Sequence, residues 1–526
     1  MNRVELVDEC ARPVIEHVSD RSVIGDGEGK VQVGEAVAAV HGERAHGGPS
    51  NDALILLRQP QHAVTESIPL LNGEHDAGFD FCSVLAILNR ELHIGPGAQT
   101  MSTVTGSGNT CGVKRLIVFV GAVVLAESAF YAVVPPLVPG LVRALGMSTT
   151  EVGILVAAYP AGVLLAALPS IALVNAGGVR TTTTAGLGML VVATLAFAWS
   201  ASPLLLDAAR FVQGIGGAVA WAGALAWLTS ESPAGRRGTT IGGAVGAALV
   251  GMVLGPVIGA AASNFGRGIV FSVIALVMTA LALASPASPV VPVARPDWIR
   301  AVAELFRSTS ANLGNGLLLI VGVVNGTVAS LVPFLVARRL GDAVMIGAIL
   351  AATYLVSSFL NVVTGRLSDR LGRLPPTLAS LVAAGVIIPF LPHIGSLLAL
   401  AVATIAASAL ISGLWAPTAA MVSDGADPGA SGQAVGVAIL NAAWAAGVSV
   451  GAVAVSRLTE SYGFTPPFVL VGGLCVVAAA ASLVVGYRVT VGGGGGIGWA
   501  RMWLQPSPSK SLESELTHRS RSLPWR

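Results

Sequence analysis

Two charged residues lie inside long apolar stretches, where charge is hardest to accommodate. Glu127 stands in GAVVLAESAFYAVVP, and Arg210 stands in the apolar run that begins near residue 203. A charged side chain at the centre of a bilayer costs about 2.5–3.5 kcal/mol on insertion scales, and such residues face a partner or a water-filled cavity. We therefore expect both side chains to point away from lipid and to take part in function.

The chemistry open to Glu127 is proton exchange. Burial favours the neutral form of a carboxyl group, whereas an approaching cation favours its charged form. One carboxylate can therefore hold either a proton or a cationic solute, which is what the exchange of protons for cations requires. The alternative is a structural carboxylate that is tied to a neighbouring helix.

Arg210 belongs to the sequence RFVQGIGG, which includes Gln213 and Gly214. The glycines of this stretch form a small-residue face that lets another backbone approach closely. The guanidinium can pair with Asp207, one turn earlier, or it can bias the protonation of Glu127. The sequence does not decide between these two roles.

A second small-residue pattern lies further along the chain. Gly251, Gly255 and Gly259 repeat at intervals of four, so they share one face of a helix. This face can pack closely on another helix, while Pro256 removes a backbone hydrogen bond and bends the helix. Geometry alone makes this stretch a packing motif.

A polar loop, GRLSDRLGR, directly follows another apolar run and places one carboxylate among three arginines. The carboxylate can cap the N-terminus of a neighbouring helix, and the arginines can bind acidic groups or phospholipid at the membrane surface. The residues of interest are Gly365, Asp369, Arg370, Gly372 and Arg373.

These residues must be positioned by membrane-spanning helices. The chain is 53% hydrophobic and 11% charged, whereas a soluble domain carries about 25% charged residues. We find twelve apolar runs between residues 116 and 487 that are long enough to cross the bilayer as helices. The composition excludes a typical soluble enzyme and predicts an all-α integral membrane protein with twelve transmembrane helices.

The twelve runs fall into two groups of six that are similar in sequence. VPGLVRALG (138–146) is similar to VPFLVARRLG (332–341), and VGILVAAY (152–159) is similar to IGAILAATY (346–354). The offset stays at 194 or 195 residues, which indicates an internal repeat. Repeated halves around a central site are typical of secondary transporters, so we expect two pseudo-symmetric six-helix bundles.

Composition also predicts the boundaries. Residues 1–100 hold 15 acidic and 7 basic side chains and no apolar run of spanning length, and Met101 opens the polar stretch before the first run. We expect Met101 to be the functional start and residues 1–113 to be a disordered or dispensable acidic extension. The bundles are predicted at 114–289 and 312–490, with a cytoplasmic linker at 290–311 and a disordered cytoplasmic tail at 491–526.

Lysine and arginine in the short loops predict the orientation. If the N-terminus is inside, the inner loops collect twelve of these residues and the outer loops five. Because positive charge accumulates on the cytoplasmic side, both termini are predicted to be cytoplasmic, in the plasma or inner membrane of the cell.

These motifs together resemble the major facilitator superfamily, and most closely its twelve-span drug:proton antiporter branch. The likeness covers about residues 114–490. The fourth-span motif, from Arg210 to Gly214, is associated in that family with proton transfer. The fifth-span motif, from Gly251 to Gly259, is characteristic of exporters. Glu127 resembles the acidic residue that many such exporters carry in the first span.

The resemblance also implies a role for the polar loop. In the family, a G-xxx-D-R-x-G-R loop joins spans two and three, recurs between spans eight and nine, and locks the outward-facing state. The second copy fits this sequence, whereas the first copy lacks the Asp-Arg pair. At the same register the first copy shows Ile171, Asn175, Ala176, Gly178 and Arg180. Asn175 can still cap a helix, but without charge.

The substrate cavity is expected where the two bundles face each other. Candidates chosen by position within the spans are aromatic and amide side chains, which suit a broad, amphipathic substrate. They are Tyr131, Trp221, Asn325, Tyr354, Asn361, Trp415, Asn441 and Trp444. Some of these will instead pack between helices.

The sequence therefore predicts a proton-coupled secondary transporter that exports a small organic or drug-like solute, cationic or amphipathic, by alternating access. Glu127 is its proton-coupling residue, and Arg210 is the modulator. One alternative is the same fold importing a sugar, an amino acid or another metabolite, against which the fifth-span motif argues. The other is a membrane receptor or assembly protein without transport, against which both intramembrane charges argue.

No enzyme activity is expected, because no metal-ligand or nucleophile–base constellation occurs in any span. We expect no metal and no cofactor, since the proton gradient supplies the energy. The expected partners are a small-molecule substrate, the proton and the lipid bilayer, with no nucleic acid. The protein is expected to act as a monomer.

Overall fold

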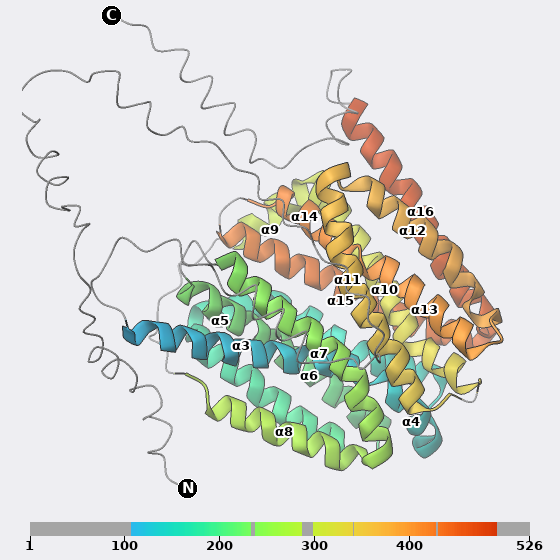
Figure 1. The fold of residues 1–526 in the computed structure, drawn as a ribbon, viewed down its shortest axis with the longest axis horizontal. Helices are drawn as coiled ribbons and strands as arrows, with labels where there is room; N and C mark the ends of the chain where they lie inside the picture. The colour runs from blue at the N-terminus through green and yellow to red at the C-terminus, as the bar shows by residue number, and fades with distance from the viewer. Residues whose placement is uncertain (1–106, 233–236, 287–297, 340, 428–429, 492–526) are drawn as a thin grey trace, which may run out of the picture. The chain divides into compact units, whose positions relative to one another are not determined.

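The computed structural model describes residues 107–232, 237–286, 298–339, 341–427 and 430–491, and each element within these ranges is a helix (Figure 1). They belong to one compact unit that begins at Thr103. The prediction of an all-α protein is confirmed. The predicted extension at 1–113 and the predicted tail at 491–526 fall almost entirely outside these ranges.

Two series of helices follow each other along the chain. The first comprises α3 (Ser107–Ala132), η2 (Pro135–Leu137), α4 (Val138–Leu145), α5 (Thr149–Trp199), α6 (Pro203–Glu231), α7 (Arg237–Phe265) and α8 (Arg267–Leu283). A short amphipathic helix, α9 (Trp298–Arg307), lies within the predicted linker. The second comprises α10 (Thr309–Ala337), α11 (Ala343–Leu371), α12 (Leu374–Ile387), η4 (Ile388–His393), α13 (Leu397–Ser412), α14 (Trp415–Gly425), α15 (Ala430–Tyr462) and α16 (Thr465–Val491).

Capping residues set several helix starts where the apolar runs are interrupted. The hydroxyl of Ser148 accepts from the N–H of Glu151 at 3.2 Å, and the carboxylate of Glu151 accepts from the N–H of Ser148 at 2.7 Å. Asp342 likewise accepts from the N–H of Met345 at 2.8 Å at the start of α11. Such caps satisfy N–H groups that have no partner within the helix.

The described helices account for twelve spans. Ten are long and apolar enough to cross a membrane, with α3, η2 and α4 counted together from Arg115 to Leu145. One of the ten, α5, has 51 residues and joins two spans at Gly178, where the backbone leaves the helical conformation. The shorter apolar helix α8, with 17 residues, is the remaining span. The described helices fit the predicted arrangement of twelve transmembrane helices.

The turns repeat between the two halves. Gly178 adopts φ 77° and Gly372, 194 residues later, adopts φ 88°. Gly266 and Gly463 form a second such pair, with φ 97° and φ 82°. Only glycine enters this left-handed region without strain, so the first copy of the polar loop keeps the residue that its turn requires. Arg180 comes two residues after its glycine, however, whereas Arg373 comes one residue after its own.

Because successive spans run in opposite directions, the turns mark two ends of the bundle. We call the end that carries Gly178 and Gly372 the Gly178 end, and the end that carries Gly266 and Gly463 the Gly266 end. Helix α9 lies at the Gly178 end, since it follows the last residues of α8 and precedes the first of α10.

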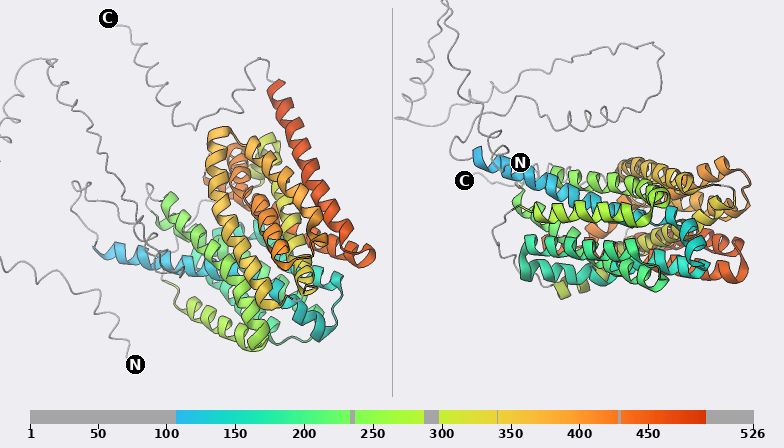
Figure 2. Two further views of the ribbon diagram at one scale, coloured as in Figure 1. Left: turned by 45° about the vertical axis from the view of Figure 1, so that its right-hand side comes forward. Right: turned by 90° about the horizontal axis from the view of Figure 1, so that it is seen from below.

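Each half has its own apolar core, and the halves meet at the Gly266 end. Helix α5 packs on α15, and α7 packs on α11. Gly153 lies against Ser456, and Gly347 lies against the Pro256 carbonyl. Towards the Gly178 end the first residues of α3 and the last residues of α16 lie far apart in the left view of Figure 2. The contacts of α5 with α15 and of α7 with α11 thus join the two halves at the Gly266 end.

Candidate functional site

Glu127 lies on α3 and faces α5 and α6 rather than lipid. The hydroxyl of Tyr159 donates to Glu127 Oε1 at 2.8 Å, and the hydroxyl of Ser128 donates to Oε2 at 3.3 Å. Gly217 of α6 lies against the side chain, so close that a methyl group there would be 3.1 Å from Glu127 Cγ. The carboxylate is therefore held within the N-terminal half.

Arg210 is buried, with 2% of its surface exposed, and points across α6 towards α3. Its guanidinium donates to the carbonyl of Phe130 at 2.8 Å and to Gln213 Oε1 at 3.0 Å. Gln213 in turn donates to Thr194 Oγ1 at 3.1 Å. Arg210 thus ties α6 to α3 through a backbone carbonyl that lies three residues beyond Glu127.

The pairing of Arg210 with Asp207 does not occur among the ion pairs of the described residues. Asp207 Oδ1 is buried without a hydrogen-bond partner, and the Arg210 donors are directed to α3 and to Gln213. Of the two predicted roles for Arg210, the local ion pair is absent from this conformation.

Tyr159 joins the two intramembrane charges and was missed by the sequence analysis. Its ring lies under the Arg210 guanidinium, with Cζ 4.5 Å from the ring centroid, while its hydroxyl binds Glu127. The signal that could have found it is the internal repeat, because Tyr159 ends the segment that matches the segment ending in Tyr354. Tyr354 is one of the predicted cavity residues, whereas Tyr159 is not.

The fourth-span glycines explain why Tyr159 can reach this position. A side chain at Gly214 would collide with the carbonyl oxygen of Tyr159, and one at Gly162 would collide with the carbonyl of Phe211. The backbones of α5 and α6 therefore touch at this crossing.

The fifth-span glycines hold the opposite side of α3. Gly255 lies against the carbonyl oxygen of Ala129, where a methyl group would be 2.5 Å away. Gly251 and Gly259, one turn to either side, lie against the carbonyls of Leu125 and Val133 in the same way. The two helices match in steps of four residues, and the segment that carries Glu127 is clamped between α6 and α7.

A chain of aromatic rings leads from this network to the C-terminal half. The centroids of Tyr159 and Tyr131 are 6.2 Å apart, those of Tyr131 and Trp444 are 4.9 Å apart, and those of Trp444 and Trp415 are 6.0 Å apart. Such separations are typical of favourable aromatic pairs. Three of the predicted cavity residues, Tyr131, Trp415 and Trp444, are thus brought together between the halves.

The other cavity candidates lie in different surroundings. Trp221 is half-buried on α6, one turn beyond Gly217, and Tyr354 is half-buried on α11. The amides of Asn325 on α10 and Asn441 on α15 are half-buried and make no hydrogen bond to the described protein. Unpaired amides at this depth are available to a polar part of a solute.

Asn361 has a structural contact instead. Its Oδ1 accepts from the N–H of Ala416 at 2.9 Å, next to the break between α13 and α14. The break leaves this N–H without a partner inside the helix, and the side chain of α11 supplies one.

Replacing Asn361 by alanine is expected to destabilise the protein by about 1–3 kcal/mol, because the N–H of Ala416 is left unsatisfied. Replacing it by glutamine keeps an uncharged amide acceptor and should lose less. Thermal unfolding of the purified variants in detergent measures both. Equal stability of the alanine variant and the wild type would show that this bond does not hold the break.

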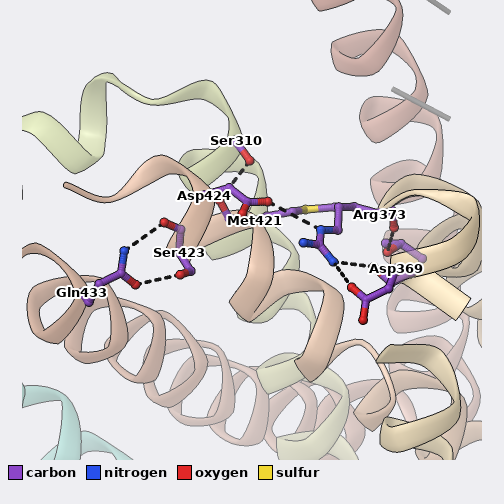
Figure 3. Close-up of polar contacts among 9 residues, drawn as sticks. Ser310, Asp369, Arg373, Met421, Ser423, Asp424 and Gln433 are labelled. Atoms are coloured by element: carbon purple, nitrogen blue, oxygen red, sulfur yellow. Dashed lines mark hydrogen bonds and ion pairs between the residues drawn. The ribbon is translucent and has the colours of Figure 1, made fainter. Parts of the chain in front are cut away.

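The polar loop forms a charged cluster at the Gly178 end, shown in Figure 3. Arg373 lies between two carboxylates, 2.8 Å from Asp369 Oδ1 and 3.6 Å from Asp424 Oδ2 of α14. Ser423, which directly precedes Asp424, donates to Gln433 Oε1 at 2.7 Å. The expected helix cap by Asp369 is replaced by this side-chain pair, and the cluster ties α11, α14 and α15 together within the C-terminal half.

The remaining loop residues have no such partners. Asn175, in the first copy, makes no side-chain hydrogen bond within the part of the chain that the structure describes, and neither does Arg370. No group of three or more His, Cys, Asp or Glu side chains that could hold a metal ion occurs among the described residues.

Comparison with known proteins identifies the family. The family model described as Major Facilitator Superfamily matches residues 119–321 and 315–512, well over half of the chain. The chain belongs to the Major Facilitator Superfamily. As a member it is a multi-pass membrane transporter that uses no cofactor, and no catalytic family is indicated. A search of curated protein sequences finds no significant match.

Solved transporter structures share the fold. A bacterial homolog of the human lysosomal transporter Spinster, inward-facing and unoccupied, aligns with TM-score 0.62 and 14% identity over 72% of this chain and 98% of its own. The nucleoside transporter NupG gives TM-score 0.58 and 11% identity, over 70% and 98%. The D-xylose-proton symporter gives TM-score 0.57 and 16% identity, over 70% and 96%. At such identities the likeness shows the fold alone.

Proposed function

We propose that this member of the superfamily is a proton-coupled exporter of the drug:proton antiporter type. It exchanges protons for a small organic solute, cationic or amphipathic, by alternating access. Glu127 carries the proton, and Arg210 adjusts its release. The solute binds between the halves, beside Tyr131, Trp415 and Trp444.

The observation that carries this proposal is the position of Glu127. The carboxylate has hydroxyl donors but no cationic ion-pair partner among the described residues, so its charge is not neutralised in place. It also lies one aromatic contact from the rings between the halves. A carboxylate without a cation beside an aromatic cluster can accept either a proton or a cationic solute.

The loop charges support an orientation with the Gly178 end in the cytoplasm. Its arginines include Arg180, Arg366, Arg370 and Arg373, in line with the cytoplasmic excess of positive charge. Both termini then lie in the cytoplasm. The working protein begins at Met101 and acts as a monomer in the plasma or inner membrane.

The clamp of α3 by the fifth-span glycines supports the direction of transport. Its motif is the exporter motif of the family that the sequence resembles, and here it packs α7 on the helix that carries Glu127. The carbonyl oxygen of Pro256, on the adjacent face of α7, lies against Gly347 of the C-terminal half. One helix therefore contacts both the proton site and the opposite bundle.

Import of a polar solute is the second candidate, and the unpaired amides of Asn325 and Asn441 favour it. Amide groups that lack protein partners can bind the hydroxyls of a sugar or a nucleoside. The sign of the proton gradient that drives accumulation separates the two functions.

The experiment uses purified protein in liposomes with the membrane potential clamped. Tetraphenylphosphonium and ethidium serve as cationic probes, and xylose and uridine as polar ones. An exporter that exchanges protons is expected to accumulate the cations when the lumen is acid. Accumulation of xylose or uridine with acid outside would show the importer instead, and no movement of any probe would contradict both functions.

A further inference from the structure

Tyr159 is held by the closest contact between α5 and α6. Its carbonyl oxygen lies against Gly214, and Gly162, one turn further along α5, lies against Phe211 and Ile215 of α6. Neither glycine leaves room for a side chain, so the backbone of α5 is fixed at this crossing. The point from which the Tyr159 side chain projects is therefore set by backbone packing, whereas its ring can still turn.

From this position the hydroxyl has two acceptors on the same residue. It donates to Glu127 Oε1 at 2.8 Å and lies 3.4 Å from the carbonyl oxygen of Glu127. Gly217 closes the space behind it, because a methyl group there would be 2.6 Å from the hydroxyl oxygen. The hydroxyl thus has a close acceptor whose charge can change and a more distant one whose charge cannot.

Protonation of Glu127 changes the balance between these acceptors. A hydrogen bond to an ionised carboxylate is about twice as strong as one between neutral groups. When the carboxylate takes up a proton from water, it becomes a neutral acceptor, and the backbone carbonyl competes for the hydroxyl. Tyr159 keeps its own proton throughout, so Glu127 alone changes charge.

The titratable and charged groups around Glu127 are few. Tyr159 faces it from α5, Arg210 lies behind the Tyr159 ring on α6, and Tyr131 lies one turn along α3. Tyr354 of α11 lies within electrostatic range of Tyr131, and α7 presents its glycines to this part of α3. None of these groups supplies a second carboxylate.

A movement of the Tyr159 hydroxyl reaches the C-terminal half through one ring. Tyr131 lies between Tyr159, at 6.2 Å, and Trp444 of α15, at 4.9 Å. On the other side, the Arg210 guanidinium lies against the Tyr159 ring. The ring is therefore in contact with both the charged network and the aromatic contact between the halves.

We propose that Tyr159 is a positioning residue that transmits the protonation state of Glu127 to the contact of Tyr131 with Trp444. This inference rests on the proposed function, in which Glu127 carries the transported proton. With Glu127 ionised, the hydroxyl bond holds the ring in the place described here. With Glu127 neutral, the ring is released, and the contact between the halves loosens.

The first measurement follows Trp444 fluorescence during a pH titration of the full-length protein in liposomes. The Trp444 signal of each protein is its fluorescence minus the fluorescence of the same protein with the added substitution Trp444→Phe. The wild type should show one transition that Glu127→Gln abolishes. Tyr159→Phe keeps the ring over Arg210 but removes the hydroxyl, and it should reduce the amplitude of the transition at least several-fold.

The second measurement is the pH profile of tetraphenylphosphonium exchange at equal pH on both sides. Tyr159→Phe should move its midpoint by about one pH unit to the alkaline side, since the carboxylate loses a donor that favours its charged form. A purely structural role would lower the amount of folded protein without moving the midpoint. Tyr462→Phe, at an exposed position on α15, is the matched control and should change neither measurement.

A second variant protects the test against misfolding of the first. Gly217→Ala removes no polar group but pushes the hydroxyl of Tyr159 away from Glu127, so it should also reduce the fluorescence transition. Glu127→Gln should abolish the fluorescence transition and the pH dependence of exchange. If it does so while Tyr159→Phe and Gly217→Ala change neither measurement, the proposed role of Tyr159 is wrong and the proposed function stands. If Glu127→Gln also changes nothing, the proposed function and this inference both fail.

Discussion

Replacing Glu127 by glutamine is expected to abolish accumulation of cationic probes driven by a pH gradient, down to the level of liposomes without protein. Glutamine has the same shape and can still accept from the Tyr159 hydroxyl, so the packing of α3 should survive. What it cannot do is exchange a proton for a cation. Flux in acid-lumen liposomes measures the loss, and thermal unfolding verifies that the variant is folded.

The matched control for this variant is Glu231→Gln. Glu231 is the exposed last residue of α6, outside the network around Arg210. Its replacement removes the same charge from the protein as a whole and should leave gradient-driven flux unchanged. Proton-driven efflux that persists in Glu127→Gln at the wild-type rate would remove Glu127 from the coupling mechanism.

Probe exchange at equal pH gives a further distinction. A transporter that has lost proton coupling alone can still exchange a labelled probe for an unlabelled one, because no net proton movement is needed. We therefore expect Glu127→Gln to retain exchange while losing accumulation. Loss of both would indicate that Glu127 also binds the cation directly, as one carboxylate shared between proton and solute allows.

The fold could be predicted from the sequence because its main determinants are local or periodic. Apolar runs of spanning length follow directly from the thickness of the bilayer, and the offset of 194 residues relates the turns at Gly178 and Gly372. The same reasoning found both intramembrane charges, since charge inside an apolar run is conspicuous. Contacts between helices that are distant in sequence have no such signature.

Tyr159 shows what the sequence could not reveal. A tyrosine in an apolar run carries no charge and attracts no notice, and its value depends on which helix crosses α5 at that point. The spacing of Asp207 and Arg210 likewise permits a local pair, yet the arginine donates to the Phe130 carbonyl of α3 instead. The first result depends on the crossing of α5 and α6, and the second depends on the packing of α6 against α3, so both are tertiary features.

Its position within a span predicts Asn361 as a cavity residue, but in the structure its side chain accepts a hydrogen bond from a backbone N–H. The break between α13 and α14 leaves the N–H of Ala416 without an intrahelical partner, and no sequence pattern in α11 announces that need. Half-buried polar residues in spans therefore include residues that bind an unsatisfied backbone group, such as Asn361, and residues whose side chains have no protein partner, such as Asn441.

Replacing Gly214 by alanine is expected to have the largest effect of any single methyl group in the N-terminal half. The new methyl group would collide with the backbone carbonyl of Tyr159, which cannot rotate away as a side chain would. Overpacking of this kind costs about 1–3 kcal/mol or more, and here it also separates α5 from α6. Thermal unfolding in detergent measures the loss of stability.

Gly188→Ala is the matched control, because Gly188 also lies inside α5 but has nothing within 4 Å of an added methyl group. Alanine favours helix over glycine by up to about 1 kcal/mol, so this variant should be neutral or slightly more stable. If the two variants unfold at the same temperature, the backbone contact at Gly214 is not as close as described.

The functional effect of Gly214→Ala follows from the same geometry. Moving the Tyr159 backbone takes the hydroxyl from Glu127 and the ring from Arg210 at once, although no polar atom has been removed. The folded fraction of this variant should therefore lose gradient-driven flux, whereas Gly188→Ala should keep it. Normal flux in folded Gly214→Ala would mean that proton coupling does not need the close crossing of α5 and α6, and that the fourth-span glycines serve stability alone.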